Sequence, residues 1–455
     1  MHGFADVREA EQFLVDHPEI DAFEVYLVDL AGISRGKLLR REEVLTVYRH
    51  GRPLPASILA LTVNGEDVDE TGLVWDVADA DCQAFPLAGS LTVLPWRKVP
   101  TAAFQLSLHP QSGQPAAVAD PRHALIRVIQ SLEQAGFYPV MAVELEFYLL
   151  DRDDDPFGRP QPARLGDGRR PHSPQVYGVR ELAQLEPFLA DLYAACKLQR
   201  LPARTAISEY APGQVEITLE HGPALLALDQ GIRYKRLVKG VADAHGMQAC
   251  FMAKPFAEHA GSGMHLHVSL ADELGHNLFA SDDPHGSPLL RHGIGGLLTT
   301  LPDALLLFCP HANSYRRFRA HSYAPLAPTW GVNNRTVSMR IPGGLPDSRH
   351  VEHRICGADA NPYLAAACVL AGLLRGISEH SDPGAPVEGN GYATAQPGAL
   401  PNWQQALARA RHSAWLHQVF GDEFMKVWLA IKEAEQEAYM AEVGEQDWRW
   451  YRYTI

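Results

Sequence analysis

Two glutamates stand close together in an otherwise apolar stretch of the chain. Glu144 and Glu146 lie in VMAVELEFYLL, residues 140–150. If this stretch is a strand, alternate residues point to one face, so the two carboxylates share a face and apolar side chains occupy the other. Neighbouring carboxylates repel each other unless a cation lies over them. The pattern therefore favours a metal site over the alternative, an exposed edge strand with solvated glutamates.

Two histidines alternate in the same way behind a glycine-rich turn. The segment GSGMHLHVS, residues 261–269, places His265, His267 and Ser269 on one face of an expected strand. A single core histidine is usually structural, whereas two on one strand face are more often part of a site. The Gly-Ser-Gly turn would let a ligand approach the backbone closely.

Further carboxylates and several arginines occupy short strand or turn segments. Glu209 precedes a Pro-Gly turn, Glu216 follows in an expected strand, and Glu352 lies in RHVEHRI. Carboxylates with one or two imidazoles suit Mg²⁺ or Mn²⁺, and arginines suit phosphate or carboxylate groups. Together they are what phosphoryl transfer needs. Walker and kinase motifs are absent from the sequence, so metals and arginines would have to hold a nucleotide. The arginines are Arg316, Arg317, Arg335, Arg340 and Arg354.

The composition narrows the class of protein. A net charge of −14 without any basic run argues against nucleic acid and anionic membranes as partners. Six scattered cysteines without a C-x-x-C pair indicate reduced thiols, and the N-terminus has no apolar signal core, so the expected location is the cytoplasm. The longest apolar stretch, 364–374, is too short to span a bilayer and predicts a core helix from Asn361 to Gly376.

Length and patterning predict two folding units of α+β or α/β class. A chain of 455 residues exceeds the usual size of one core. Pro110, Gly113 and Pro115 suggest a boundary, which gives domains at 1–110 and 111–455. Strands are expected at 22–29, 139–150, 214–219, 247–253, 264–270 and 335–341. Helices are expected at 6–16, from 121 to Gly136, at 179–199 and 223–245, and as a pair within 402–443.

The motifs, taken in order, resemble the glutamine synthetase family. They are VDLAGISRGK, VELEFY, SEYAPGQVEI, KPF, GSGMHLHVS, NSYRRF, NNRTVSMRIP and VEHRICGADANPY. The resemblance implies an N-terminal β-grasp domain followed by a catalytic domain built on an α/β half-barrel. It also implies a homo-oligomer, a dodecamer of two stacked hexameric rings, whose active sites are shared between neighbouring subunits. ATP and two or more Mg²⁺ or Mn²⁺ ions per site are the implied substrate and cofactors.

The resemblance also assigns roles residue by residue. One metal would be held by Glu146, Glu209 and Glu216, and the second by Glu144, His265 and Glu352. The ATP side would be formed by His267, Ser269, Arg335 and Arg340. Glutamate would be bound by Arg317, Arg354 and the backbone around Gly261. Asp29 would reach into a neighbouring subunit's site, and the implied catalytic residues are Asp29, Arg317 and Arg335.

Two positions depart from the family pattern. Glutamine synthetases carry a glutamate after the NSY[KR]R motif that helps bind and deprotonate ammonium, and this chain has Tyr323 there. They carry an asparagine before GSGMH, and this chain has Ala260. A phenol is neutral near pH 7, so Tyr323 cannot replace the carboxylate. The expected activity is ATP-dependent ligation of glutamate to an organic amine through a γ-glutamyl phosphate. The alternatives are a true glutamine synthetase that uses ammonia and an inactive structural homologue.

Overall fold

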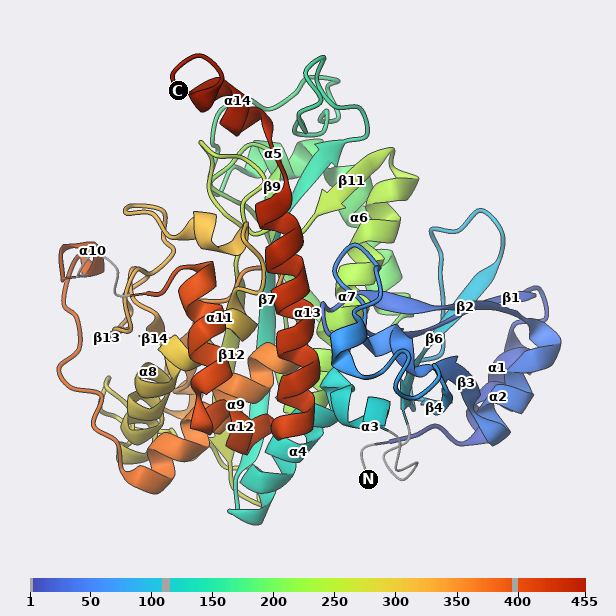
Figure 1. Ribbon diagram of the computed structural model, residues 1–455, viewed down its shortest axis with the longest axis horizontal. Coiled ribbons are helices and arrows are strands. Elements are labelled where there is room, and N and C mark those ends of the chain that lie inside the picture. The colour runs from blue at the N-terminus through green and yellow to red at the C-terminus, as the bar shows by residue number, and fades with distance from the viewer. Residues whose placement is uncertain (1–2, 109–114, 395–399) are drawn as a thin grey trace.

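Two β-sheets organise the protein in the computed structural model, which describes residues 3–108, 115–394 and 400–455 (Figure 1). The N-terminal sheet has six strands in the order β2-β1-β6-β4-β3, with β5 paired to β6. Its middle strands β1 and β6 run parallel, and the β1–β2 and β4–β6 pairs are antiparallel. This is the β-grasp part of the predicted fold. Its elements are α1 (Val7–Asp16), β1 (Ala22–Val28), β2 (Ser34–Arg40), α2 (Val44–His50), β3 (Arg52–Pro55), β4 (Asp81–Pro86), β5 (Thr92–Val93) and β6 (Thr101–Leu108).

The second sheet is larger and carries the residues singled out above. It has nine strands in the order β13-β14-β15-β12-β7-β9-β8, with β10 and β11 also paired to β7, and it curls into a half-barrel. Its longest strand is β7, which runs through the centre of the molecule in Figure 1. Its strands are β7 (Tyr138–Asp151), β8 (Ala203–Ser208), β9 (Gln214–Leu219), β10 (Gly222–Pro223), β11 (Met247–Cys250), β12 (Met264–Ala271), β13 (Trp330–Val332), β14 (Met339–Ile341) and β15 (Val351–His353).

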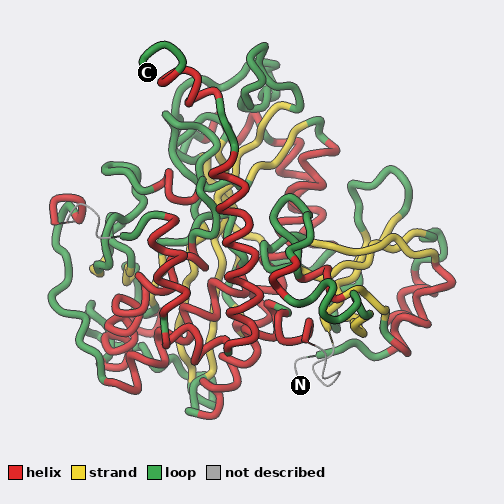
Figure 2. The backbone as a smooth tube through the Cα atoms, in the orientation of Figure 1, coloured by secondary structure: helices red, strands yellow, loops and turns green. Residues whose placement is uncertain are grey.

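Helices cover the apolar face of this sheet (Figure 2). A Cβ on Gly231 of α7 would lie 3.7 Å from the Val143 side chain, so α7 packs directly on the side of β7 opposite its glutamates. The helices are α3 (Pro115–Ala119), α4 (Pro121–Gln134), α5 (Val179–Gln184), α6 (Glu186–Leu198), α7 (Ala224–Ala244), α8 (Pro288–Phe308), α9 (Pro362–Glu379), α10 (Gly391–Thr394), α11 (Trp403–His412), α12 (Ala414–Phe420), α13 (Asp422–Ala441) and α14 (Glu445–Tyr451).

Several predicted ends of elements were wrong. The helix α9 begins at the Asn361 cap as predicted but continues past Gly376 to Glu379. Gly376 instead permits close packing, since a Cβ there would lie 2.2 Å from the carbonyl oxygen of His292 on α8. The helix expected at 179–199 is divided into α5 and α6, the pair expected in 402–443 is three helices, and the strand expected at 335–341 is only β14. The predicted boundary near residue 110 lies outside the described residues.

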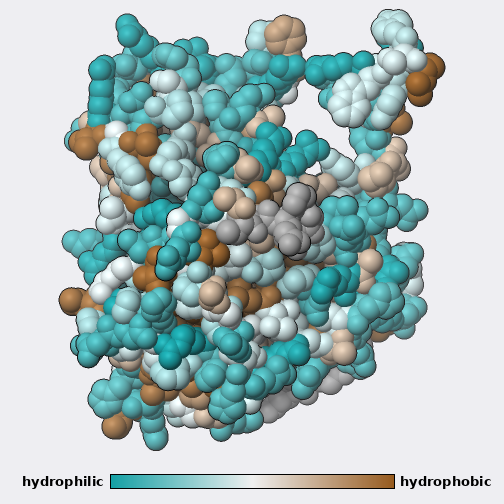
Figure 3. Space-filling model, turned by 90° about the vertical axis from the view of Figure 1, so that its left-hand side faces the viewer, coloured by the Kyte–Doolittle hydropathy of each residue, from teal (hydrophilic) through white to brown (hydrophobic). Residues whose placement is uncertain are grey.

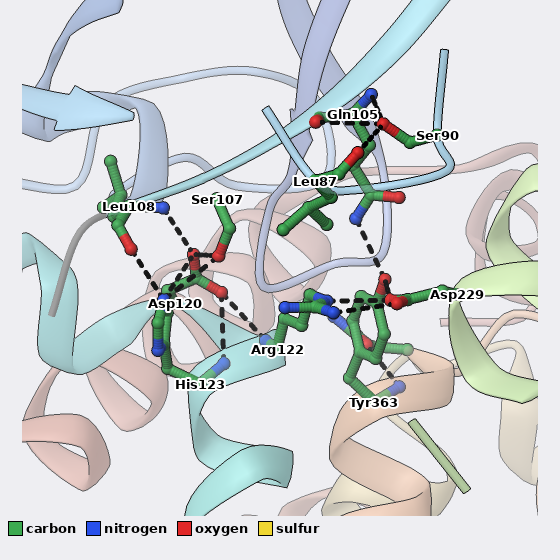
Figure 4. Close-up of polar contacts among 11 residues, drawn as sticks. Leu87, Ser90, Gln105, Ser107, Leu108, Asp120, Arg122, His123, Asp229 and Tyr363 are labelled. Carbon is green, nitrogen blue, oxygen red and sulfur yellow. Dashed lines mark hydrogen bonds and ion pairs between the residues drawn. The ribbon is translucent and has the colours of Figure 1, made fainter. Parts of the chain in front are cut away.

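The strongest capping prediction was correct. Asp120 caps α4, where its Oδ1 accepts hydrogen bonds from the backbone N–H groups of Arg122 (2.9 Å) and His123 (3.3 Å). Its Oδ2 accepts from the Ser107 hydroxyl (2.9 Å) and the Leu108 N–H (3.1 Å) on β6. The start of α4 is therefore fixed to the last strand of the N-terminal sheet (Figure 4).

A largely buried polar network joins the same strand to three helices of the second unit, α4, α7 and α9 (Figure 4). Arg122 donates two hydrogen bonds of 2.8 Å to Asp229 on α7. The Tyr363 hydroxyl on α9 donates to Asp229 Oδ1 at 2.6 Å and accepts from Gln105 Nε2 of β6 at 2.9 Å. The network holds the two sheets in a fixed relation.

The side of the molecule drawn in Figure 3 is mostly hydrophilic, with separate small apolar patches. None of the helices formed by residues 3–108, 115–394 and 400–455 combines the length and the apolar character that a bilayer crossing requires.

Candidate active site

The register of the large sheet brings the predicted metal ligands together. On β7, Glu146 is paired with Glu216 of β9, and Glu144 is paired with His265 of β12. On the other side of β12, His267 is paired with Glu352 of β15. Side chains directly opposite each other on neighbouring strands share a face. One face of four adjacent strands therefore carries the carboxylates and imidazoles that the sequence places far apart.

One predicted triad is close enough to bind a single cation. One oxygen from each of Glu146, Glu209 and Glu216 lies within 4.8 Å of the others. Glu146 is also oriented by the glycine-rich turn, because the Gly263 N–H donates to its Oε2 at 2.6 Å. These are the three residues that the family resemblance assigns to one metal, and their role as ligands stays a prediction.

Around Glu144 the structure brings together more residues than the second predicted set of ligands. Ligand atoms of Glu144, Glu216 and His265 lie within 4.8 Å of one another, and so do those of Glu144, His267 and Glu352. His265 Nδ1 is 3.3 Å from Glu144 and 3.7 Å from Glu352. His267, predicted to face ATP, is thus also within reach of a cation bound by Glu144 and Glu352.

Repulsion between carboxylates is largest at the first triad. Burial, and then the negative charges of Glu144 and Glu146, raise the pKa of Glu216 well above its usual value. Burial also raises the pKa of Glu146. Within the described residues, Glu216 forms no ion pair with a cationic side chain. A divalent cation would supply the missing positive charge, so the residues fit Mg²⁺ or Mn²⁺.

The carboxylates nearer β15 are instead compensated by cationic side chains. Burial opposes ionisation of Glu352, but Arg354, the two histidines of β12 and Arg340 hold its pKa at about 2. Burial likewise opposes ionisation of Glu144, but contacts with His265 and His267 lower the pKa of this group. The site therefore has a compensated side and an uncompensated side.

The two arginines at Glu352 keep some hydrogen-bonding capacity. Arg340 Nη1 donates to Glu352 at 2.7 Å and its Nη2 donates to Asn333 at 3.0 Å, while Arg354 Nη1 donates to the other Glu352 oxygen. The Nε atoms of Arg340 and Arg354 are buried without a hydrogen-bond partner, whereas His267 Nε2 lies 3.2 Å from Glu144 Oε1. Buried donors of this kind usually have a partner in the working state. The two arginine Nε atoms can therefore still donate to an anion.

The remaining predicted arginines lie on the same side of the sheet. Arg317 is buried and donates from Nη1 to the Ile355 carbonyl at 2.9 Å. A Cβ on Gly261 would lie 2.6 Å from Arg317 Cγ, so this glycine is required for close approach of the arginine. Arg335 is exposed and has an electrostatic effect on Glu209, and within the described residues it forms no hydrogen bond or ion pair. Ser269, half-buried on β12, is paired with Val140 of β7.

The comparison with known families agrees with this geometry. The model of the glutamine synthetase catalytic domain matches residues 118–451.

The chain belongs to the glutamine synthetase family.

Relatives of the chain in this family include ligases that act on amines. The γ-glutamylputrescine synthetase PuuA of Escherichia coli (strain K12) is 37% identical, covering 98% of this chain and 95% of the relative. The glutamate–isopropylamine ligase of a Pseudomonas species is 30% identical, covering 93% and 94%. A solved structure of a GmaS/ADP complex superposes with a TM-score of 0.83 at 27% identity, covering 97% and 98% of the two chains.

The residue that departs from the glutamine synthetase pattern lies beside the first triad. Tyr323 has a positive φ of 58°, a conformation that an aromatic residue adopts only at a cost in energy. Its ring lies 4.9 Å from that of Tyr210, and the two hydroxyl oxygens are 3.2 Å apart. The aromatic pair is therefore linked to Glu209 of the first triad through Tyr210, which follows Glu209 in the chain and is subject to its charge.

Two residues near this site, Tyr210 and His350, are not among those predicted from the sequence. Tyr210 was visible in SEYAPGQ, where it adjoins Glu209. His350 lies in RHVEHRI, and its Nε2 is 2.9 Å from His267 Nδ1. Tyr210 is adjacent to Glu209 and His350 is two residues before Glu352, so sequence proximity was the available signal. The second departure, Ala260, accepts a hydrogen bond from the Tyr148 hydroxyl through its carbonyl at 2.5 Å.

Asp29 lies apart from the cluster within this chain. It is 1% exposed and accepts hydrogen bonds from Arg35 Nε and the Ile33 N–H, both at 2.8 Å. Its carbonyl accepts from Asn361 Nδ2 at 2.9 Å, which attaches the loop after β1 to the start of α9. Burial raises the pKa of this carboxyl. A role for Asp29 in a neighbouring subunit stays a prediction.

Proposed function

We propose that the protein is an ATP-dependent ligase that joins the side-chain carboxylate of glutamate to an organic amine. One observation carries this proposal: the carboxylate and imidazole cluster on β7, β9, β12 and β15 is bordered by the Tyr210–Tyr323 aromatic pair. The cluster supports phosphoryl transfer, and the pair supports an amine larger than ammonia. The amine ligases among its relatives agree with both parts.

Two divalent cations are part of the proposal. Glu146, Glu209 and Glu216 would hold one, and Glu144, His265 and Glu352 the other, with His267 beside it. Bound Mg²⁺ or Mn²⁺ would offset negative charge on the transferred phosphoryl group. The uncompensated charge at Glu216 supports this assignment.

The other side chains bind and orient the substrates. Arg335 and Arg340 would contact the phosphates of ATP, with His267 and Ser269 toward the nucleotide. Arg317 and Arg354 would bind the carboxylates of glutamate, and the backbone at Gly261 its amino group. Arginine suits both tasks because its planar fork matches two oxygens at once.

The reaction proceeds in two balanced steps. A carboxylate is a poor electrophile, so the glutamate side chain first takes the γ-phosphoryl group of ATP, which forms an acyl phosphate and releases ADP. The amine then attacks the acyl carbon, the C–O bond to phosphate breaks, and the nitrogen loses a proton to a base. The products are the γ-glutamyl amide, phosphate and ADP, and the arginines stabilise charge in both transition states.

Tyr323 sets the expected preference among amines. A neutral ring cannot attract and deprotonate ammonium as a carboxylate does, but it can pack against alkyl or aryl groups. Burial of each CH₂ contributes about 0.8 kcal/mol, so a four-carbon chain gains roughly 3 kcal/mol that ammonia cannot. We expect kcat/KM for organic amines to exceed that for ammonia at least about tenfold.

The test is ADP release with glutamate and a panel that contains ammonia, methylamine, butylamine, diaminobutane and aniline. Tyr323→Glu should shift the preference toward ammonia, and Tyr177→Phe, a nearby exposed tyrosine, is the matched control. If ammonia is the best substrate of the unmutated enzyme, the protein is a glutamine synthetase in activity as well as in family. ADP release with none of the amines would leave the inactive homologue.

A shared active site is the second part of the proposal. We infer that Asp29 acts as a base in the site of the adjacent subunit, within a dodecamer of two stacked hexameric rings. Head-to-tail contacts of this kind close a ring. Asp29→Ala and Arg335→Ala subunits, each inactive alone, should regain activity when unfolded and reassembled together. Mixed rings that are confirmed by mass and remain inactive would exclude the shared site.

The proposed location is the cytoplasm. All six cysteines are free thiols, as expected in a reducing compartment.

A further inference from the structure

The inference that follows rests on the proposed ligase function and concerns which amines the site selects. Tyr323 and Glu388 line one cavity of about 640 Å³. His285, Asn333, Arg335 and Val387 lie on the same walls. The sequence offered no acidic residue that could bind a second amino group of the substrate, because Glu388 is 65 residues after Tyr323 and lies in no recognised motif.

The backbone on both sides of Glu388 is fixed in place. The Asn334 side-chain amide donates to the carbonyls of Val387 at 3.1 Å and of Gly389 at 2.9 Å. The Val387 N–H donates to the Trp330 carbonyl at 2.8 Å. The loop is therefore attached to β13 and to the turn that follows it, and the position of residue 388 is determined by these bonds.

The carboxylate itself remains available. Glu388 is exposed, and within the described part of the chain it forms no hydrogen bond or ion pair. Arg335 lines the same cavity, but in the proposed reaction its guanidinium contacts phosphate. Glu388 is then the acidic side chain of the cavity wall that can accept a cation from a substrate.

The loop of Glu388 and the loop of Tyr323 are also packed together. The Tyr392 hydroxyl donates to the Ala324 carbonyl at 3.2 Å, and its ring lies 5.4 Å from that of His321. On the other side, Tyr323 contacts Tyr210, which follows Glu209 of the first triad. The order in space is thus carboxylate cluster, aromatic pair, cavity and Glu388.

We propose that Glu388 binds the distal ammonium group of a diamine substrate. The amino group that reacts lies at the carboxylate cluster, the methylene chain lies along the Tyr323 ring, and the second ammonium group forms an ion pair with Glu388. An aromatic face can pack against the methylene chain of the diamine and attract its ammonium groups. A carboxylate can form an ion pair with the distal ammonium group. The site therefore selects an aliphatic diamine over a monoamine of the same chain length.

The test compares 1,4-diaminobutane with butylamine, which differs only in lacking the second amino group. The unmutated enzyme should have the higher kcat/KM for the diamine. Glu388→Gln should lower the ratio of diamine to butylamine kcat/KM by roughly three- to tenfold, the range expected for a partly exposed charged hydrogen bond. Glu388→Lys should lower it further, because two like charges then meet. Glu273→Gln, an exposed glutamate outside the cavity, should leave the ratio unchanged.

The outcomes separate this inference from the proposed function. An unchanged ratio in both Glu388 variants, with circular dichroism and oligomer mass like those of the unmutated enzyme, would overturn the role of Glu388. A preference of the unmutated enzyme for butylamine would also overturn it, while leaving the glutamate–amine ligase intact. A failure of the unmutated enzyme to release ADP with any amine would overturn the ligase itself.

Discussion

The protein contains two buried polar clusters that differ in one respect. In the network between the sheets, Asp229 receives two hydrogen bonds from Arg122 and one from Tyr363. In the site on the large sheet, Glu216 faces Glu144, Glu146 and Glu209 without a cationic partner among the described residues. The first cluster is balanced in charge within the chain, whereas the second is not.

This difference separates a structural role from a functional one. In a buried ion pair the two charges compensate each other, and losing one partner leaves an uncompensated charge. A group of like charges is unfavourable by itself, and it persists because folding elsewhere holds the strands in register. Binding of a cation would recover the energy that is lost there.

The largest effect is expected in the balanced network. Asp229→Ala leaves the buried Arg122 guanidinium without its carboxylate and should lower the free energy of unfolding by about 3–5 kcal/mol. Urea unfolding followed by circular dichroism measures this. Glu379→Ala, which removes a surface pair with Arg375 on α9, is the control and should cost below about 1 kcal/mol. Equal losses in the two variants would mean that the network does not stabilise the fold.

In the carboxylate cluster on the large sheet, a substitution should reduce activity strongly without reducing stability. Glu146→Ala should lower kcat/KM for ADP release at least about a hundredfold, which corresponds to about 2.7 kcal/mol, because a metal ligand is lost. Its metal-free unfolding free energy should stay the same or rise, since one of the repelling charges is gone. Glu220→Ala, an exposed carboxylate just after β9, is the control. Full activity of Glu146→Ala would contradict the metal-site assignment.

Metal addition should distinguish the two clusters directly. At a Mn²⁺ concentration of ten times Kd, binding to the folded state stabilises the unmutated protein by about 1.4 kcal/mol. Thermal unfolding with and without Mn²⁺ should show this rise, and Glu146→Ala should lose most of it. Glu379→Ala should retain all of it. A rise of the same size in Glu146→Ala would place the bound ion elsewhere.

The smallest effect is a pH dependence of the metal-free protein. Since burial and like charges raise the pKa of Glu216 above its usual 4.5, the folded state holds a proton that the unfolded state releases. Stability is then highest below that value and falls as pH rises toward the raised pKa, by up to about 1 kcal/mol between pH 5 and pH 6. Urea titrations at the two pH values measure the fall. The Glu216→Gln variant should lack the contribution of Glu216 to this fall in the free energy of unfolding. If the variant and the unmutated protein show the same fall, other groups cause it.

Parts of the fold could be predicted because their signals are local. Asp120 and Pro121 predicted the start of α4, and the alternation around Glu144 predicted β7 within a residue or two at each end. Predictions failed where packing between helices decides. Gly376 was taken as a helix end, but it lies inside α9 where α8 approaches too closely for a side chain. Propensity describes one segment at a time and contains no information about its neighbour.

The domain limits of 1–110 and 111–455 and the individual roles of the site residues stay predictions. The structure does show which of the predicted site residues lie close together. The triad of Glu146, Glu209 and Glu216 was predicted and is close in space. The grouping of His267 with Glu144 and Glu352 was not predicted, because a family motif assigns each histidine one partner set, whereas the register of β12 places both histidines beside the carboxylates.

The sequence by itself determined the family, and it predicts which residues bind metal and phosphate and that Tyr323 replaces a carboxylate. These conclusions depend on residue types and short spacings, which the sequence contains directly. Only the tertiary structure decided that Glu146 faces Glu216, that Tyr323 packs on Tyr210, and that Glu388 shares a cavity with Tyr323. Each of these contacts joins residues from different strands or loops. Strand register and loop packing are set by many weak contacts across the whole sheet, so they cannot be read from any one segment.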